Sequence, residues 1–458
     1  MAHPTAFAVE GCAVVTMDPH RVEHAVGHVV VEGGRIAAVG SGPAPRPTDA
    51  RIVDGRGCVL TPGLVNAHHH LYQWVTRGLA VDATLFEWLT TLYPVWAGLD
   101  EDIGHAAAAA GLGRLALSGC TTSMDHHYVF PSDGGDLLAA AEIRAAGEVG
   151  MRFLPTRGSM DLGRRDGGLP PDAVVETVDA ILAATADAID RYHDPSPEAT
   201  VRIGVAPCSP FSVTADLLRE SAALARDRGV RLHTHLAETR DEEEFCRERF
   251  GSTPVDYVGS LGWLGDDVWL AHGVHLSDDA IGRLSASGTG VAHCPSSNAR
   301  LGAGIARTRD LLAAHVPVGL GVDGAASNEA SALLEEARHA LLLARAVGGP
   351  QALGVRDALE LATIGGARVL GWDDRIGSIE VGKAADLALW RVDGLAHADL
   401  ADPVAGLVIG SPPPLELLLV GGRPVVERDR LSAVDEDDLT RGAVAASTTL
   451  LRRAGLVA

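Results

Sequence analysis

From residue 59 onwards, short apolar segments alternate with longer amphipathic ones, and the alternation repeats eight times. The apolar segments have the length of buried β-strands, and the amphipathic segments have the periodicity of α-helices. Consecutive strand–helix units form parallel sheets, because each helix returns the chain to the end at which the next strand starts. Eight units predict a closed (β/α)8 barrel. The predicted strands are 59–65, 121–125, 152–156, 201–206, 230–234, 268–271, 290–293 and 316–322.

An open, doubly wound sheet is the alternative fold for the same alternation. That fold usually carries a Gly-rich phosphate-binding loop after its first strand. Here the first strand is followed by AHHHL, residues 67–71, which contains no glycine. We therefore predict the barrel, and we assign residues 59–370 to it.

Two regions outside the barrel have β character, residues 1–58 and residues 371–435. Each contains a Gly-Gly pair of the kind found in hairpin turns, in VEGGR (31–35) and in VGGR (420–423). Because the two motifs are similar, we expect both chain ends to meet in one small β-sandwich domain beside the barrel. Residues 436–458 are predicted to close the chain as a helix.

The composition argues against several classes of function. Of the 458 residues, 47% are hydrophobic and 21% are charged, which is typical of a globular protein. The formal net charge of −22 argues against binding to nucleic acid or to an anionic membrane surface. We see no signal-peptide pattern and no membrane-spanning apolar run, and the six cysteines are scattered. We expect a cytoplasmic protein.

Histidines and acidic residues follow several of the predicted strands. In a barrel of this kind the catalytic residues lie at the carboxyl ends of the strands. His68 and His70 are two residues apart at the end of the first strand, so their side chains face the same way. His235 follows the fifth strand and Asp323 the eighth. Three neutral imidazoles and one carboxylate can hold a catalytic divalent metal ion with a position open for water. We expect one zinc ion, and iron suits the same ligands.

Two more polar residues at the same end of the barrel are candidates for proton transfer. Glu238 lies three residues beyond His235 and can carry a proton to the substrate. His272, at the end of the sixth strand, can hold the water or polarise the atom under attack. We interpret three further histidines as structural: His233, His275 and His293. The sequence leaves the roles of His126 and His127 open.

Five motifs resemble the amidohydrolase superfamily, and most closely its cytosine- and guanine-deaminase-like aminohydrolase branch. They are PGLVNAHHHL, HTHLAET, LAHGVHL, HCPSSN and GLGVDGAASN, and the C-terminal GSIEVGKAADLALW is similar to the family's second β segment. The resemblance covers nearly the whole chain and implies a hydrolytic deaminase that forms a homo-oligomer. Binuclear members use a carboxylated barrel lysine, but the only lysine here, Lys383, lies beyond the barrel. The resemblance therefore implies a single metal ion.

The resemblance also implies a mechanism. Water activated by the metal ion loses a proton to Asp323 and attacks an amino-bearing carbon of a heteroaromatic ring. Glu238 protonates the adjacent ring nitrogen, His272 steadies the attacking oxygen, and ammonia leaves. The cytidine-deaminase type of zinc site is a different arrangement, and it would need a PCxxC motif that this sequence lacks.

Four residues are candidates for substrate binding. Gln73 can read the edge of a purine or pterin with its carboxamide, Trp96 can stack on a flat ring, and Arg157 can bind a ring carbonyl. Members that deaminate adenosine derivatives carry Glu and His at the positions of Trp96 and Cys208. The resemblance therefore implies a small-molecule heteroaromatic substrate that is a free base rather than a nucleoside.

The choice of ring rests on three motifs, NAHHHLYQ, SGCTTSMDHHYVFP and APCSPFSV. They are most similar to those of enzymes that convert 8-oxoguanine and water to urate and ammonia. Isoxanthopterin or guanine deaminases, and aminohydrolases of hydroxyatrazine-type triazines, are alternatives that the sequence does not separate. A non-catalytic barrel scaffold is a further hypothesis, but it is disfavoured because every metal-binding and acid–base residue is present.

Overall fold

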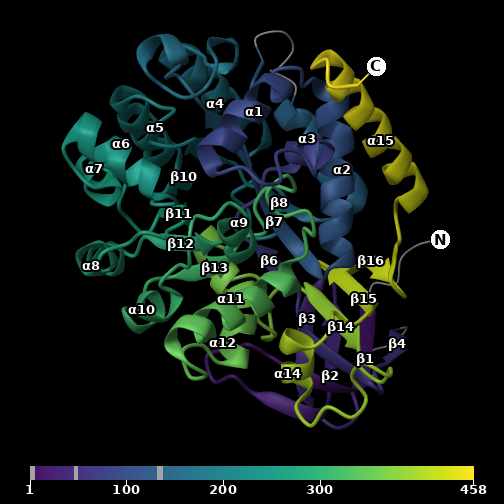
Figure 1. Cartoon of the computed structure of the whole chain (residues 1–458). Helices are drawn as coiled ribbons and strands as arrows, with labels where there is room; N and C mark the ends of the chain where they lie inside the picture. Colours follow the sequence, from purple (N-terminus) through teal and green to yellow (C-terminus); the bar gives the residue numbers. More distant parts are fainter. Residues whose placement is uncertain (1–5, 46–49, 132–137, 458) are drawn as a thin grey trace.

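The computed structural model describes residues 6–45, 50–131 and 138–457, which form a barrel with a separate β-domain at its side (Figure 1). Within these residues the barrel sheet has eight parallel strands, hydrogen-bonded in chain order. The amide of Ala67, after the first strand, donates to the carbonyl oxygen of Leu320 in the last strand at 2.8 Å. The predicted (β/α)8 barrel is confirmed. Its strands are β6 (Leu64–Asn66), β7 (Cys120–His127), β8 (Arg152–Ser159), β9 (Gly204–Pro207), β10 (Leu232–Leu236), β11 (Val268–His272), β12 (Gly290–His293) and β13 (Val318–Leu320).

Helices follow the barrel strands, and their ends are readable from the sequence. They are α2 (Glu101–Leu117), α3 (Leu138–Val149), α4 (Val178–Tyr192), α5 (Ala215–Arg228), α6 (Arg240–Phe250), α7 (Pro254–Ser260), α8 (Asp278–Ser287), α9 (Pro295–Arg300), α10 (Thr308–Ala313), α11 (Leu333–Gly348), α12 (Val355–Glu360) and α13 (Gly366–Leu370). Thr214 and Ser277 cap α5 and α8, because each side chain accepts the backbone N–H three residues on. Gly229 and Gly288 end the same helices in the left-handed conformation that glycine adopts readily.

In the described part of the two chain ends, nine strands form one mixed sheet in the β-domain. They are β1 (Ala6–Val15), β2 (Glu23–Glu32), β3 (Arg35–Ser41), β4 (Arg51–Asp54), β5 (Cys58–Pro62), β14 (Leu387–Arg391), β15 (Leu415–Val420), β16 (Arg423–Glu427) and β17 (Arg430–Leu431). Val9 and Leu387 belong to the same hydrophobic core. The two hairpin turns pack together, since a Cβ on Gly34 would lie 2.8 Å from the carbonyl oxygen of Gly421. The meeting of both chain ends is confirmed, and the expected sandwich is a single mixed sheet.

The chain passes from the β-domain into the barrel at Gly63. β5 pairs with β14 of the β-domain, whereas β6 pairs with β7 of the barrel. The predicted strand 59–65 is therefore two strands in different sheets, and the first barrel strand starts at Leu64. Glycine is needed at the crossing because a Cβ on Gly63 would lie 2.2 Å from Thr121 Cγ2.

Gly119 lies at the contact between the two domains, and replacing it should destabilise the fold. Its φ is 89°, and a Cβ there would lie 2.2 Å from the Trp390 ring of β14. Gly119→Ala should lower the free energy of unfolding by about 3 kcal/mol, through left-handed backbone strain and overpacking. Gly229→Ala is the control, because its φ is 64° and nothing lies within 4 Å of the added Cβ. Chemical denaturation of both variants measures the difference, and equal losses would contradict the packing argument.

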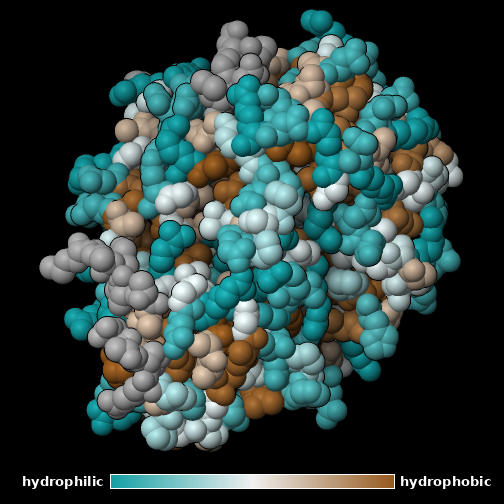
Figure 2. All heavy atoms as spheres, turned by 180° about the vertical axis from the view of Figure 1, so that it is seen from behind, coloured by the Kyte–Doolittle hydropathy of each residue, from teal (hydrophilic) through white to brown (hydrophobic). Residues whose placement is uncertain are grey.

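The C-terminal helix α15 (Glu436–Arg453) packs along α2 on the outside of the barrel (Figure 1). The Ser447 hydroxyl donates to the carbonyl oxygen of Val75 at 2.8 Å. The predicted helix 436–458 thus ends at Arg453, and the last residue of that prediction, Ala458, lies outside the described residues. On the face seen in Figure 2, hydrophobic side chains lie in small groups between hydrophilic ones. None of the helices in the described ranges is long and apolar enough to cross a membrane.

Candidate active site

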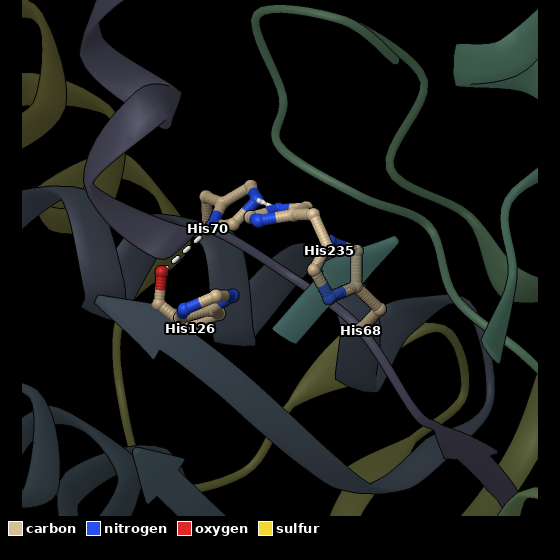
Figure 3. A group of neighbouring side chains, drawn as sticks. All are labelled: His68, His70, His126 and His235. Atoms are coloured by element: carbon tan, nitrogen blue, oxygen red, sulfur yellow. Dashed lines mark hydrogen bonds between the residues drawn. The ribbon is translucent and has the colours of Figure 1, made fainter. Parts of the chain in front are cut away.

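Three histidines and an aspartate from distant parts of the chain meet at the carboxyl ends of the barrel strands. His68 and His70 follow β6, His235 lies on β10, and Asp323 follows β13. The Nε2 atoms of His70 and His235 are 3.1 Å apart. Asp323 Oδ1 lies 3.4 Å from His68 Nε2 and 3.3 Å from His70 Nε2. All four side chains are buried, and Figure 3 shows the histidine rings grouped at the ends of their strands.

Hydrogen bonds at Nδ1 fix the tautomer of each of the three histidines. His70 and His235 each donate from Nδ1 to a backbone carbonyl oxygen, at 2.6 and 2.7 Å. His233 Nδ1 also donates to a backbone carbonyl, which leaves its Nε2 to accept a hydrogen bond from His68 Nδ1 at 2.9 Å. In His68, His70 and His235 the proton is therefore on Nδ1, and the lone pair of Nε2 is directed into the cluster.

The donor set of this cluster fits a divalent metal ion. Unprotonated nitrogens this close to one another and to a carboxylate repel unless a cation lies between them. His68 Nε2 has no hydrogen-bond partner among the described residues. Burial lowers the pKa of His68 and of His235 well below the ordinary value, so both stay neutral. Burial alone would raise the pKa of Asp323, but the neighbouring imidazoles hold it well below its ordinary value. Three neutral nitrogens and one carboxylate oxygen are ligands that zinc and similar ions prefer.

His126 on β7 is a fourth histidine beside this cluster. Its carbonyl oxygen accepts the hydrogen bond from His70 Nδ1, which is the dashed line at its backbone in Figure 3. Its ring stacks on His235 with 4.7 Å between centroids, and its Nε2 donates to the carbonyl oxygen of Ala206. One ring nitrogen from each of His68, His70, His126 and His235 lies within 4.8 Å of the others. The sequence left the role of His126 open, and the structure places it where it orients His70.

Glu238 and His272 lie next to the cluster. Glu238 Oε2 is 3.6 Å from His272 Nε2, and both side chains are buried. Burial and the nearby Asp323 raise the pKa of Glu238 well above its ordinary value, which favours the protonated form of the carboxyl group. A protonated carboxyl group in such a position can act as a general acid.

The backbone is strained at His272 and at Asp323. Their φ angles are 72° and 63°, in the left-handed region that residues other than glycine rarely adopt. Each is held by the segment that begins α9: Ser297 Oγ donates to Asp323 Oδ2 at 2.5 Å, and Asn298 Oδ1 lies 2.9 Å from His272 Nδ1. Strain of this kind costs about 1–3 kcal/mol per residue and is typical of active sites, where it fixes the orientation of a functional side chain.

Three supporting residues were not predicted from the sequence: Ser297, Asn298 and Glu242. The Glu242 carboxylate accepts the backbone N–H groups of Ala237 and Glu238, both at 2.9 Å, and so holds the turn that carries Glu238. A signal for Glu242 was present, because T-x-x-E at 239–242 has the pattern of a capping box. Ser297 and Asn298 lie within the motif HCPSSN, but the sequence does not indicate what each residue of this motif contacts.

A cavity separates the cluster from α1 (Leu85–Trp96). Every residue that lines it is at most 8% exposed, and its volume is about 30 Å³, which is room for about two water molecules. Leu85, Trp88, Leu89 and Tyr93 of α1 form one wall. The cavity is too small for a purine as it stands, so part of its wall must move before such a ring fits, and α1 forms one side of that wall.

Two of the predicted substrate-binding residues, Gln73 and Cys208, line this cavity. Neither amide atom of Gln73 has a hydrogen-bond partner within the described part of the chain. The amide packs against Gly324, where a Cβ would lie 1.7 Å from Gln73 Oε1. An unpaired buried polar group costs about 1–3 kcal/mol, so the amide of Gln73 is a group that a ligand could satisfy.

The structure does not place Trp96 or Arg157 among the residues that line the cavity, and their roles in substrate binding stay predictions. Trp96 lies in the core, where its Nε1 donates to Thr76 Oγ1 at 3.1 Å. Trp88, two turns earlier on α1, lines the cavity instead. Arg157 forms an ion pair with Glu176 at 2.7 Å. The spacing of tryptophans along a helix does not say which of them faces a site.

Four other residues considered in the sequence analysis do not line the cavity: His127, His275, His293 and Lys383. His127 Nδ1 lies 2.8 Å from a carboxylate oxygen of Glu142, and His275 Nε2 donates to a backbone carbonyl at 2.9 Å. His293 is buried at the end of β12. Lys383 donates to the Ser378 hydroxyl at 2.6 Å, in the segment that precedes β14 of the β-domain. The chain's only lysine is therefore not available to bridge a second metal ion in the barrel.

A parallel eight-stranded barrel with three histidines and a carboxylate converging at its mouth is the architecture of a metal-dependent hydrolase. The chain belongs to the amidohydrolase family, whose model matches residues 59–414. Within that family the chain is an aminohydrolase, an enzyme that hydrolyses carbon–nitrogen bonds.

Two relatives and one solved structure are similar over most of their length. The 8-oxoguanine deaminase of Pseudomonas aeruginosa is 49% identical over 403 residues, which cover 87% of this chain and 89% of that protein. An isoxanthopterin deaminase from an unknown prokaryotic organism is 40% identical over 447 residues, which cover 92% and 91%. The crystal structure of an atrazine chlorohydrolase from Arthrobacter aurescens, complexed with zinc, is 34% identical with a TM-score of 0.92, covering 96% of this chain and 100% of that one.

Proposed function

We propose that this enzyme uses one zinc ion to deaminate a free heteroaromatic base, and that the base is 8-oxoguanine, which gives urate and ammonia. One observation carries the proposal: His70, His235, Asp323, Glu238 and the unpaired amide of Gln73 line the same cavity, and His68 lies next to the two histidines. The 49% identity to an 8-oxoguanine deaminase supports this ring. Zinc is supported by the ligand set and by the zinc-containing relative, and iron is the alternative.

The walls of the cavity favour a flat, uncharged ring. Trp88 and Leu89 of α1 supply apolar surface on which such a ring can stack. Cys208 also lines the cavity, and burial raises the pKa of its thiol to about 12, so this side chain is uncharged as well. The small cavity is better suited to a free base than to a nucleoside. The ribose of a nucleoside would need space that the packed side chains of α1 occupy.

His68, His70, His235 and Asp323 would hold the metal ion, which supplies a Lewis acid that makes water a better nucleophile at neutral pH. Asp323 accepts a proton from the attacking water and passes it to the departing amino group. Glu238, which is protonated, donates to the ring nitrogen next to the attacked carbon. Glu238 then regains a proton from the new hydroxyl group as the carbon–nitrogen bond breaks. Water thus provides the oxygen of the product, the proton left on the ring and the third hydrogen of ammonia.

His272 orients the reacting water rather than exchanging a proton with the solvent. Its Nδ1 is held by Asn298, and its Nε2 faces Glu238 at 3.6 Å. This arrangement points the imidazole at the space between the general acid and the metal ligands. An imidazole fixed in this way can stabilise charge that develops on the attacking oxygen.

A different leaving group is the second candidate. The atrazine chlorohydrolase has the same fold at a TM-score of 0.92, and its name describes a hydrolysis that removes chloride from atrazine. The same cluster and the same attack on a ring carbon would serve a hydroxylated triazine. The amide of Gln73 favours the purine, because a lactam edge presents a donor and an acceptor side by side.

The test is a substrate panel measured with the zinc-loaded enzyme. Ammonia release from 8-oxoguanine, guanine, isoxanthopterin and a hydroxylated aminotriazine gives a kcat/KM for each compound. We expect 8-oxoguanine to have the highest value, with urate as the product detected by chromatography. If 8-oxoguanine is inert and the triazine or the pterin turns over, the ring assignment is wrong although the deaminase assignment stands.

A further inference from the structure

We propose that Tyr93 is a further substrate-binding residue, whose hydroxyl group forms a hydrogen bond with a polar atom on the edge of the ring that faces α1. The inference rests on the proposed function and narrows its substrate class. The ring should carry its amino group at one edge and a carbonyl oxygen or ring nitrogen at another. Oxidised purines and pterins meet this requirement.

The position of Tyr93 is the first support. Its side chain is fully buried and lines the cavity from α1, across from the metal-binding cluster. Its hydroxyl oxygen has no hydrogen-bond partner among the residues that the structure describes. A buried hydroxyl without a partner is unfavourable, and a ligand in the cavity that accepts its hydrogen bond would remove that cost.

The composition of the α1 wall is the second support. Leu85 and Leu89 are apolar, and the indole N–H of Trp88 already donates to the carbonyl oxygen of Ala326 at 3.2 Å. Tyr93 is thus the residue of this wall with a hydrogen-bonding group still free. Burial raises the pKa of Tyr93 well above its ordinary value, so the hydroxyl keeps the proton that it would donate.

The small volume of the cavity gives this hydrogen bond a function. Because about 30 Å³ is too small for a purine, part of the wall must move to admit the ring and then close on it. If α1 is the part that moves, the hydrogen bond from Tyr93 forms only on closure. The binding energy of the correct ring is then coupled to completion of the active site.

Tyr93→Phe tests the inference because it removes one oxygen atom and keeps the ring. For a substrate-binding hydroxyl, kcat/KM for 8-oxoguanine should fall about tenfold, the usual worth of one neutral hydrogen bond. The melting temperature should stay equal or rise, because the change removes an unpaired polar atom from the core. A hydroxyl with a structural role would show the opposite pattern, a lower melting temperature with unchanged kinetics.

Tyr257→Phe is the matched control. Tyr257 on α7 is also buried, and its hydroxyl also lacks a hydrogen-bond partner among the described residues. Its ring stacks on Phe250, with 3.8 Å between the centroids, and it does not line the cavity. This variant should show the same thermal effect as Tyr93→Phe with unchanged kcat/KM.

The outcomes separate this inference from the proposed function. The activity of the wild-type enzyme on the panel tests the proposed function. The role of Tyr93 is tested by the ratio of the variant's kcat/KM to that of the wild type, measured on the panel compound that the wild type turns over best. A kcat/KM within twofold of wild type overturns the inference even when the deaminase activity is high. A melting temperature of Tyr93→Phe clearly below that of the wild type overturns the inference, whether or not any panel compound is turned over.

Discussion

Glu238→Gln should lower kcat by about 10³-fold or more while leaving the metal ion bound, since general acid–base catalysis is usually worth about 10²–10⁴-fold. The amide has nearly the same size and shape as the carboxyl group but cannot donate a proton and take it back. None of the close contacts among the metal ligands involves Glu238, whose Oε2 lies 3.6 Å from His272 Nε2. Ammonia release gives kcat, and elemental analysis should still find about one metal ion per chain.

The control for this variant is Glu244→Gln, the same substitution on the exposed side of α6. It should leave kcat and metal content unchanged, because Glu244 does not line the cavity. Near-normal turnover in Glu238→Gln would show that the proton comes from another group. A loss of metal in the same variant would instead place Glu238 among the ligands.

The barrel and the residues at its mouth could be predicted because both depend on short-range patterns. Alternating apolar and amphipathic segments specify strand–helix units, and a parallel barrel gathers the carboxyl ends of its strands at one face. His68 and His70 share a face for the simplest reason, the two-residue period of an extended chain. Once the barrel is assumed, His235 and Asp323 must lie near them, although they are separated by 88 residues in the sequence.

The start of the barrel and the substrate wall could not be predicted in the same way. β5 and β6 are both fully buried, so the apolar pattern runs across Gly63 without a break while the chain changes sheets. Trp88 and Trp96 lie on the same helix, and only its packing decides that Trp88 faces the cavity while Trp96 bonds to Thr76. Such choices depend on contacts between distant elements, which leave no local periodicity in the sequence.

The hydrogen bonds that prepare the cluster also depend on distant contacts. The sequence indicates which side chains can bind a metal ion, but it does not give their tautomers. These follow from backbone carbonyls on neighbouring strands and, for His68, from His233. His233 was predicted to be structural, and its bond to His68 Nδ1 shows why a structural histidine is needed there. Its replacement would leave the orientation and the tautomer of His68 undetermined.

His235→Ala should abolish binding of the metal ion and lower kcat by at least about 10³-fold. Activation of the water by the metal ion lowers the free-energy barrier of the reaction by several kcal/mol, and this contribution is lost. The substitution deletes one of three convergent nitrogens and leaves His70 Nε2 without the neighbour that lies 3.1 Å away. Elemental analysis of the purified variant should find well under one metal ion per chain. His105→Ala is the control, since His105 lies outside the cavity and pairs with Glu148 at 2.9 Å.

Thermal unfolding with a chelator distinguishes lost metal binding from general damage to the fold. A metal ion that binds only the folded chain stabilises it, so chelation should lower the melting temperature of the wild type and of His105→Ala. His235→Ala should melt at the same temperature with and without chelator, because it has no bound ion to lose. A chelator-sensitive His235→Ala that keeps a full complement of metal would mean that the ion lies elsewhere, and the assignment of the cluster would fail.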